Sequence, residues 1–324
     1  MAQPHASYII MPNNNQRNVN IHCLSRTSYN YSEEAHTAIM PDFDVTVDEA
    51  ERHSSTCPDI RSKRDLTSLS EVEEYETGKF LRSSFAYIDK NDTVWFGELP
   101  GIRKYDLTVE ILKRELRRIP DEKIYPLHDK RMSVVASDQI EQQNYYTKRP
   151  KVWCAGNEYV LKLIPRMLFE EAEILEYLNQ DQHRHPNIIR YHGCTVRRGR
   201  ITGLALKKYD VMLQYRYQNV PRDLDVAVCM DGIRAGVKHL HSLGLAHNDL
   251  NPTNIALDAE DNPIILDFGS CKKFGEELIS AGTPGWIDED YTTSAQQHDI
   301  IAMGKIEAWL REENQKRRSD HIRK

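Results

Sequence analysis

Polar residues in two neighbouring loops constrain this chain more than any other feature of its 324 residues. Residues 247–254 read His-Asn-Asp-Leu-Asn-Pro-Thr-Asn, so one polar loop carries Asp249 and, five residues later, Asn254. The apolar segment 263–266 then leads directly into Asp267, which is followed by Phe and Gly. Carboxylate and amide oxygens that converge from a loop and a strand end suit Mg²⁺, which binds hard oxygen ligands and keeps phosphate oxygens in its shell. The pattern therefore predicts a site for a phosphate compound bound together with a metal ion.

The predicted elements run from a mainly β first half to a mainly helical second half. Aromatic and β-branched residues at 80–88 and 93–99 flank a four-residue polar turn, which predicts a β-hairpin. Asp106 or Thr108 can cap a helix that runs to about Arg118. Further strands are predicted at 145–148, 158–164, 201–206 and 263–266, and further helices at 166–179, 225–243 and 300–310. This order of elements suggests two lobes.

Composition and charge exclude several classes of protein. The net charge of -6 argues against a general nucleic-acid binder, for which a basic surface is expected. No run of about 18 apolar residues is present, so we expect no membrane span. No two of the six cysteines lie within four residues of each other, which argues against a paired-cysteine zinc site and a disulfide scaffold. The first residues lack a secretory signal, so we expect an intracellular protein, cytoplasmic or nuclear.

Motifs along residues 145–310 resemble, in the same order, those of the protein kinase family. The loop at 247–254 is similar to the catalytic loop H-R-D-x-x-x-x-N, and Asp267 with its Phe-Gly is similar to the metal-binding D-F-G. The stretch of about 79–310 also resembles a group of fungal serine/threonine kinase-like proteins. The resemblance implies an α+β fold of two lobes, with a β-rich N-lobe and a helical C-lobe that is shortened at its C-terminus. Segments 185–189, 282–286 and 298–304 resemble the family's H-P-N-I-V, G-T-P-x-Y and S-D-I-x-S-x-G motifs.

The resemblance also implies ATP and Mg²⁺ as cofactors and gives roles to individual residues. Asp249 would be the catalytic base, and Asn254 and Asp267 would hold Mg²⁺. His247 would pack the loop, and Asp299 would tie it from below. The alternative for Asp249 and Asn254 is a capped turn that binds no metal. The implied partner is a protein substrate, which the sequence does not name, and the oligomeric state stays open.

Two lysines compete for the position that contacts the ATP phosphates and pairs with a helix glutamate. Lys162 follows Val-Leu and so resembles the family's V-A-I-K, but it precedes Glu171, the predicted partner, by only nine residues. Lys148 precedes Glu171 by 23 residues, which is closer to the family's separation, and it ends a β-prone run. We therefore predict that Lys148 lies within ion-pair reach of Glu171, and Lys162 remains the alternative.

Several departures from the family pattern bear on activity. No G-x-G-x-x-G is present, and the glycines before residue 150 are Gly78, Gly97 and Gly101, so the loop that covers the ATP phosphates is altered or absent. Asn248 stands where the family has the arginine of its catalytic loop. Asn251 stands where the family has the lysine that steadies the transferred phosphate. The missing glycines predict weak nucleotide binding.

The sequence divides into four segments. Residues 1–74 hold 12 Asp and Glu against 6 Lys and Arg and show no sustained apolar period, which predicts a disordered acidic N-terminal segment. Residues 75–130 form a family-specific hairpin–helix extension of the N-lobe, and residues 131–206 form the kinase-like N-lobe. Residues 207–324 form a truncated kinase-like C-lobe with a basic tail, and residues 207–209 would be the hinge.

Two functions from different classes fit this organisation. The first is an ATP-dependent phosphotransferase, a protein serine/threonine kinase, which the intact Asp249, Asn254 and Asp267 favour. The second is a pseudokinase that keeps the fold as a binding or scaffold module, which the missing glycines and the short C-lobe favour. A small-molecule kinase is a third hypothesis, against which the segment 282–286 argues.

Overall fold

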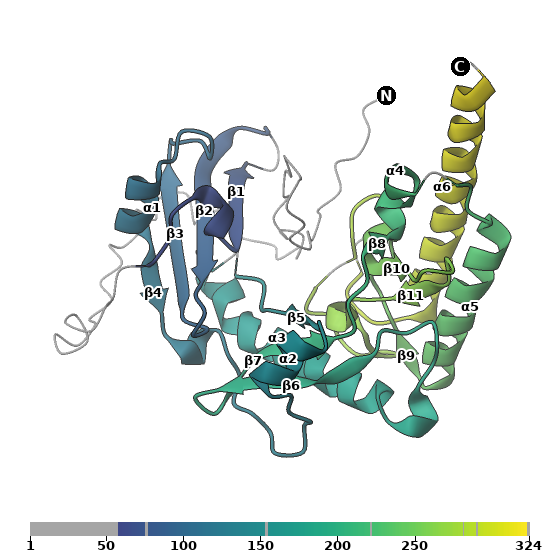
Figure 1. The fold of residues 1–324 in the computed structure, drawn as a ribbon, viewed down its shortest axis with the longest axis horizontal. Coiled ribbons are helices and arrows are strands. Elements are labelled where there is room, and N and C mark those ends of the chain that lie inside the picture. Colours follow the sequence, from purple (N-terminus) through teal and green to yellow (C-terminus); the bar gives the residue numbers. More distant parts are fainter. Residues whose placement is uncertain are drawn as a thin grey trace, which may run out of the picture.

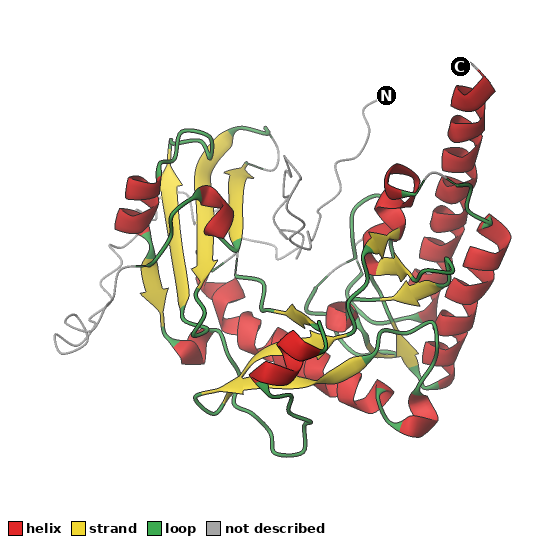
Figure 2. Ribbon diagram, in the orientation of Figure 1, coloured by secondary structure: helices red, strands yellow, loops and turns green. Residues whose placement is uncertain are grey.

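The described part of the chain begins with an antiparallel sheet, continues through a small β-rich lobe with one long helix, and ends in a helical lobe (Figure 1). In this computed structural model it comprises residues 58–74, 77–152, 155–220, 222–280, 282–289 and 291–322. Strands dominate the first half and helices the second (Figure 2). This is the α+β arrangement of a β-rich N-lobe and a helical C-lobe that the sequence predicts.

The end of the acidic segment 1–74 is folded. There, β1 (Ser68–Glu73) pairs antiparallel with β2 (Phe80–Ile88), and Leu69 packs against a small apolar core. The prediction of disorder is therefore wrong for residues 58–74, because a strand with so few apolar side chains gains its stability from a neighbour distant in sequence. The remainder of that prediction, for residues 1–57, lies outside the described residues.

The extension that follows contains the predicted hairpin, formed by β2 and β3 (Val94–Pro100). The predicted helix is α1 (Val109–Glu115), and the side chain of Thr108 caps it by accepting from the backbone N–H of Ile111. It ends before Arg118, because residues Arg117–Ile119 form β4 at the edge of a sheet with the order β1-β2-β3-β4.

The two faces of this sheet pack against different parts of the molecule. Phe85 and Trp95 form a small apolar core with Leu112 of α1 and with the leucines that flank this helix, Leu107 and Leu116. Ala86, Val94 and Ile119 instead belong to the main core of the molecule, which continues through α3 (Glu158–Leu178). The extension is thus packed against the long helix of the N-lobe rather than held as a separate domain.

The sheet of the N-lobe has three strands in the described residues, in the order β5-β7-β6. Strands β6 (Tyr191–Arg197) and β7 (Arg200–Leu206), the second of which is predicted, form a hairpin whose turn places Arg198 and Gly199 at positive φ. The short helix α2 (Ser137–Gln142) precedes β5 (Tyr146–Lys148). A helix without glycine therefore stands before β5, where the family has the strands that flank its glycine-rich loop.

Helix α3 overturns one prediction. Residues 158–164 are its first turns and not a strand, and Pro165 lies within the helix instead of starting it. The helix begins at Asn157, whose side chain accepts from the backbone N–H of Val160. Proline removes one helical hydrogen bond, and the β-branched residues favour a strand locally. Both effects are overcome because Ile164, Leu168, Ala172 and Leu175 are buried at helical spacing in the main core.

The C-lobe is built on α5 and α6. Helix α5 (Val226–Ser242) starts at its N-cap Asp225, as predicted, and the chain leaves it through Gly244 at a φ of 76°. The other elements of the described C-lobe are β8 (Val211–Met212), α4 (Arg216–Asn219), β9 (Leu245–Ala246), β10 (Ile255–Leu257), β11 (Pro263–Ile265), β12 (Lys272–Lys273) and α6 (Gln296–Ile322). Six 3-10 turns complete the described elements of the chain: Lys63–Asp65, Asp121–Lys123, Asp181–His183, Leu213–Tyr215, Pro252–Asn254 and Phe268–Ser270.

Strand β8 pairs with β10, and a 3-10 turn and α4 follow it. One prediction for the C-lobe needs correction. Helix α6 runs to Ile322 and not to residue 310, so the basic tail is helical where it is described. Residues 207–209 do connect the two lobes, between β7 and β8.

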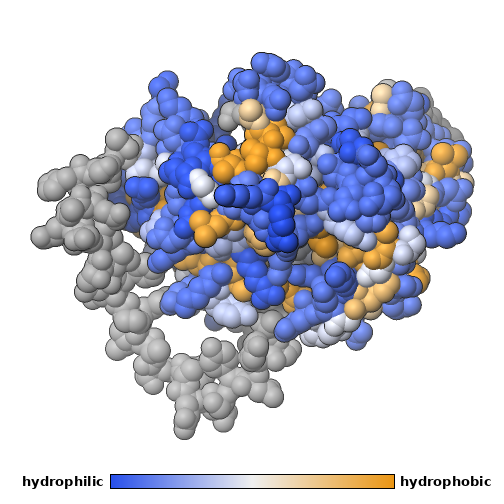
Figure 3. All heavy atoms as spheres, turned by 90° about the horizontal axis from the view of Figure 1, so that it is seen from below, coloured by the Kyte–Doolittle hydropathy of each residue, from blue (hydrophilic) through white to orange (hydrophobic). Residues whose placement is uncertain are grey.

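Seen from below, the surface is largely hydrophilic, with apolar residues gathered in separate patches (Figure 3). Among the described residues, none of the helices has the length and apolar character needed to cross a membrane.

Candidate functional site

Three charged side chains meet where the lobes join. Lys148, at the end of β5, donates to both carboxylate oxygens of Glu171 on α3, at 2.5 and 2.6 Å. It also donates to Oδ1 of Asp267 at 2.7 Å. Glu171 in turn accepts from the backbone N–H of Phe268 at 3.1 Å, which ties α3 to the turn that carries Asp267. The predicted ion pair of Lys148 with Glu171 is therefore present.

Burial makes this cluster electrostatically strong. The side chains of Lys148 and Asp267 are each 12 % exposed, and that of Glu171 is 6 % exposed. Burial alone would lower the pKa of Lys148, but the charges of Asp267 and Glu171 hold it above its ordinary value. Burial alone would raise the pKa of Asp267, but Lys148 and Lys151 hold it far below the usual range. Lys148 and Asp267 thus both stay charged at neutral pH.

Lys162 lies elsewhere. It is in the second turn of α3, its side chain is 73 % exposed, and it pairs with Glu158 at 2.9 Å one helical turn earlier. Its resemblance to V-A-I-K is therefore misleading, because the segment that seemed to be a strand is helical.

Asp249 is held by hydrogen bonds from both sides. Its Oδ1 accepts from the backbone N–H of Thr283 at 2.8 Å and from the Thr283 hydroxyl at 2.7 Å. The amide nitrogen of Asn254 donates to Asp249 Oδ2 at 3.0 Å and to its carbonyl oxygen at 2.9 Å. Burial raises the pKa of Asp249, and the hydrogen bond from Thr283 partly offsets this effect. The carboxylate is thus fixed in position and made more basic than usual.

The loop that carries Asp249 is anchored from below by a buried aspartate. Asp299 on α6 accepts from the backbone N–H groups of His247 and Asn248, both at 2.9 Å. The imidazole of His247 is fully buried and lies 2.8 Å from the carbonyl oxygen of Leu266. These contacts match the structural roles that the sequence gives to His247 and Asp299.

Asn248, which stands where the family has an arginine, makes hydrogen bonds of its own in the catalytic loop. It sits at a φ of 62°, a left-handed conformation that asparagine tolerates, and its amide nitrogen donates to the carbonyl oxygens of Ala246 and Ser270, both at 2.9 Å. The amide oxygen accepts from the backbone N–H of Ala295. Asn248 therefore binds the loop to its neighbours, a role that the sequence comparison with arginine does not predict.

The donor set at the predicted metal position fits Mg²⁺. Asp267 supplies a carboxylate from the turn after β11, and Asn254 supplies an amide oxygen, since its amide nitrogen is directed to Asp249. Mg²⁺ commonly binds one or two such protein oxygens and completes its shell with phosphates and water. Among the described residues, no group of three or more His, Cys, Asp or Glu is arranged to hold a metal ion. Two protein oxygens would leave most of the Mg²⁺ shell to other oxygen ligands.

A second lysine, which the sequence analysis did not single out, also reaches the cluster. The Nζ atom of Lys151 lies 3.4 Å from Asp267 Oδ2. Strand β5 ends at Lys148, and Lys151 follows after Arg149 and Pro150. The spacing of Lys151 from Lys148 does not predict this contact, because the position of Lys151 depends on how the chain turns after the strand.

The extension is joined to the same strand by charged contacts. Asp92, in the turn between β2 and β3, accepts from the guanidinium of Arg149, the residue directly after Lys148. It also accepts from Nε of Arg197 at 3.1 Å, and its side chain is 11 % exposed. Asp92 thus links the extension to the end of β5.

We expect Asp92→Asn to lower the free energy of unfolding by about 1.5–3 kcal/mol, the range for a hydrogen bond to a charged group. Asparagine keeps the side chain's size and tolerates the positive φ of 59° at this position, so the change removes mainly the charge. Chemical denaturation of the full chain measures the difference. Asp59→Asn is the matched control, because Asp59 pairs with Arg61 at 3.7 Å on the surface, and we expect it to change stability by less than about 0.5 kcal/mol. An equal effect of the two changes would contradict the link.

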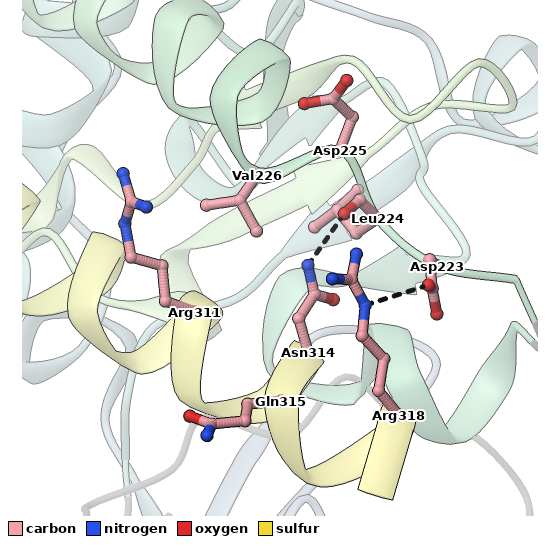
Figure 4. A pocket seen from close by; sticks show the side chains of 8 residues that line it. All are labelled: Asp223, Leu224, Asp225, Val226, Arg311, Asn314, Gln315 and Arg318. Atoms are coloured by element: carbon pink, nitrogen blue, oxygen red, sulfur yellow. Dashed lines mark hydrogen bonds and ion pairs between the residues drawn. The ribbon is translucent and has the colours of Figure 1, made fainter. Parts of the chain in front are cut away.

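A separate hollow of about 600 Å³ lies in the C-lobe, between the start of α5 and the second half of α6 (Figure 4). Within it, Asn314 donates to the carbonyl oxygen of Leu224 at 3.0 Å. None of its lining residues belongs to the site described above. They are Asp223, Leu224, Asp225, Val226, Arg311, Asn314, Gln315 and Arg318.

Comparison with known proteins gives relatives of one kind. The chain is similar to the human serine/threonine-protein kinase/endoribonuclease IRE2, at 32 % identity over 147 residues, which cover 41 % of this chain and 16 % of the relative. It is also similar to the serine/threonine-protein kinase/endoribonuclease IRE1 of Hypocrea jecorina, at 31 % identity over 151 residues, 40 % of this chain and 12 % of the relative. The serine/threonine-protein kinase Tao of Drosophila melanogaster is 29 % identical over 147 residues, 44 % of this chain and 13 % of the relative. The matched region thus spans less than a fifth of the length of these three proteins.

The family described as the protein kinase domain matches residues 136–306, just over half of the chain. This range contains Lys148, Glu171, Asp249, Asn254 and Asp267, which the structure gathers where the two lobes meet. The chain therefore belongs to the protein kinase family.

Proposed function

We propose that this chain is an ATP-dependent protein serine/threonine kinase that transfers the γ-phosphoryl group of ATP to a protein hydroxyl. The observation that carries the proposal is the buried network of Lys148, Glu171 and Asp267 beside a carboxylate, Asp249, that is fixed by Thr283 and Asn254. A folded domain that needed only to hold its shape would gain little from burying so many charges, because desolvating an ion costs several kcal/mol. Such charges are typical of a site that binds phosphates.

In this proposal Lys148 binds phosphate oxygens of ATP, and Glu171 keeps its ammonium group in place. Asn254 and Asp267 would hold Mg²⁺, which when bound neutralises the phosphate charge that develops during transfer. Because Lys148 and Asp267 are already paired, the protein part of the site is formed before nucleotide arrives.

Asp249 would orient the substrate hydroxyl and accept its proton. The hydroxyl oxygen forms a bond to the γ-phosphorus, while the bond from that phosphorus to the oxygen bridging to the β-phosphate breaks and leaves its electron pair on ADP. A raised pKa favours this role, because a more basic carboxylate accepts the proton more readily. Thr283, which donates to Asp249, holds the carboxylate towards the substrate side.

The second candidate, a kinase-like binding module, is favoured by one observation. Between Gly101 and Gly156 the chain has no glycine, and α2 precedes β5 where a glycine-rich hairpin would cover the phosphates. Fewer backbone N–H groups are then available to bind the phosphates. This observation predicts weak nucleotide affinity, and the intact polar network favours the enzyme.

Calorimetric titration of the full chain with ATP distinguishes these two functions from a kinase-like fold that binds no nucleotide. We expect binding in the presence of Mg²⁺ and a much weaker interaction when EDTA removes the ion, because Asn254 and Asp267 need the metal to bind phosphates. Asp267→Asn should weaken the Mg²⁺-dependent part. A chain that binds ATP equally well with and without Mg²⁺, or not at all, would contradict the proposed function.

A further inference from the structure

The catalytic loop of this chain lacks a positive charge at a position where one is expected. Asn251 stands two residues after Asp249, and its amide nitrogen donates to the Thr283 hydroxyl at 3.1 Å and to the Asp249 carbonyl oxygen at 3.1 Å. The amide thus helps to hold the loop, but it carries no charge. Phosphoryl transfer develops negative charge on the phosphoryl oxygens, and catalysis of this reaction depends largely on cations placed beside them.

We propose that Lys151 supplies this missing charge and contacts the transferred phosphoryl group. The inference rests on the proposed function and concerns one residue of the same site. It begins from the position of Lys151, whose Nζ lies 3.4 Å from Asp267 Oδ2, on the oxygen that Lys148 does not contact. Lys148 and Lys151 therefore approach Asp267 through its two different oxygens.

The two lysines differ in exposure and in their distance from Asp267. The Nζ atom of Lys148 lies 2.7 Å from Asp267 Oδ1, and its side chain is 12 % exposed. The Nζ atom of Lys151 lies 3.4 Å from Asp267 Oδ2, and its side chain is 37 % exposed. A lysine ammonium on a flexible four-carbon stem can move from a carboxylate to a phosphate when a metal ion takes up that carboxylate.

The backbone holds Lys151 close to the reaction. On one side of it lies β5 with Lys148, and Arg149 is fixed to Asp92 of the extension. Pro150 is buried and restricts the chain between them. The Nζ atom of Lys151 therefore lies beside Asp267, the carboxylate that would hold Mg²⁺. This is the region through which the phosphoryl group must pass.

Two other lysines near α3 do not serve this position. Lys162 pairs with Glu158 on the exposed side of α3, and Lys272 pairs with Glu170. Among the lysines that the structure describes, Lys148 and Lys151 therefore contact Asp267.

The test uses the full chain with four changes: Lys151→Met, Lys151→Arg, the double change Lys151→Met with Asn251→Lys, and Lys162→Met as the matched control. Two quantities are measured, the turnover number for phosphoryl transfer and the ratio of Mg²⁺–ATP affinity to Mg²⁺–ADP affinity by calorimetry. The affinity ratio isolates the contact to the γ-phosphate and does not depend on turnover. Thermal unfolding confirms that each variant is folded.

We expect Lys151→Met to lower turnover by about 10- to 100-fold, which is somewhat less than the effect of removing a fully buried hydrogen-bond donor. The change should also reduce the preference for ATP over ADP. Lys151→Arg should keep most of both quantities, since it keeps the charge. Asn251→Lys should restore turnover in the Lys151→Met background, because it returns a cation to the catalytic loop. Lys162→Met should change neither quantity.

Three results would overturn the proposal while leaving the kinase function intact: a Lys151→Met variant with wild-type turnover and affinity ratio, equal losses in Lys151→Met and Lys151→Arg, or a folded double variant as inactive as Lys151→Met. Failure of the wild-type chain to bind Mg²⁺–ATP is a different result, and it would overturn the proposed function together with this inference.

Discussion

Asp249→Asn is expected to lower the turnover number for phosphoryl transfer by about 10²–10⁴-fold, the usual contribution of a positioned general base. The amide cannot accept the proton of the substrate hydroxyl, although it has nearly the same shape as the carboxylate. Affinity for Mg²⁺–ATP should change little, because Asp249 is held by Thr283 and Asn254 and would contact the substrate hydroxyl instead of the phosphates. Steady-state kinetics and calorimetry on the same preparation measure both quantities.

The matched control for this change is Asp181→Asn. Asp181 is 87 % exposed and pairs with Arg184 on the surface, so its charge can be removed without touching the site. Turnover of the control should equal that of the wild type. Equal turnover in the wild type and in Asp249→Asn would remove Asp249 from the mechanism.

Lys148→Met is expected to affect both function and stability. Turnover should fall by about 10²–10³-fold, because a preorganised charge on the phosphates is lost. The free energy of unfolding should fall by about 3–5 kcal/mol, since Glu171 and Asp267 would remain buried beside each other without their common partner.

A double change separates the two effects. Adding Glu171→Gln to Lys148→Met removes one of the two unpaired carboxylates, so it should recover part of the lost stability but none of the turnover. Denaturation and kinetic measurements on the single and double variants form a thermodynamic cycle. A double variant that is less stable than Lys148→Met, or as active as the wild type, would contradict the arrangement described here. Lys162→Met, on the exposed side of α3, should leave stability and turnover unchanged.

The C-lobe part of the site could be predicted because its chemistry is local in sequence. Asp249 and Asn254 share one loop, and Asp267 follows the hairpin of β10 and β11 that begins directly after this loop, so their proximity follows from one short stretch of chain. The pairing of Lys148 with Glu171 was also predictable from spacing, because a strand and the helix after it need a minimum length of chain between them.

Predictions failed where packing between distant segments decides the structure. Residues 158–164 include β-branched side chains that favour a strand locally. The segment is nevertheless helical, because helical spacing buries both Ile164 and Leu168 in the main core. Residues 68–73 show little apolar character and become a strand because β2 offers a partner. Lys151 and Asp92 lie near the site for the same reason, since their positions depend on how the extension and the end of β5 meet.

The central claim is that this chain transfers phosphate, and one measurement tests it most directly. The full chain is incubated with Mg²⁺ and ATP labelled in the γ-phosphate, together with degenerate peptides that offer serine or threonine, and the label on the peptides is followed over time. We predict time-dependent labelling that disappears when EDTA removes Mg²⁺ and falls at least 100-fold in Asp249→Asn. Peptides that stay unlabelled by a chain that binds Mg²⁺–ATP, or labelling that is equal in the wild type and in Asp249→Asn, would contradict the account.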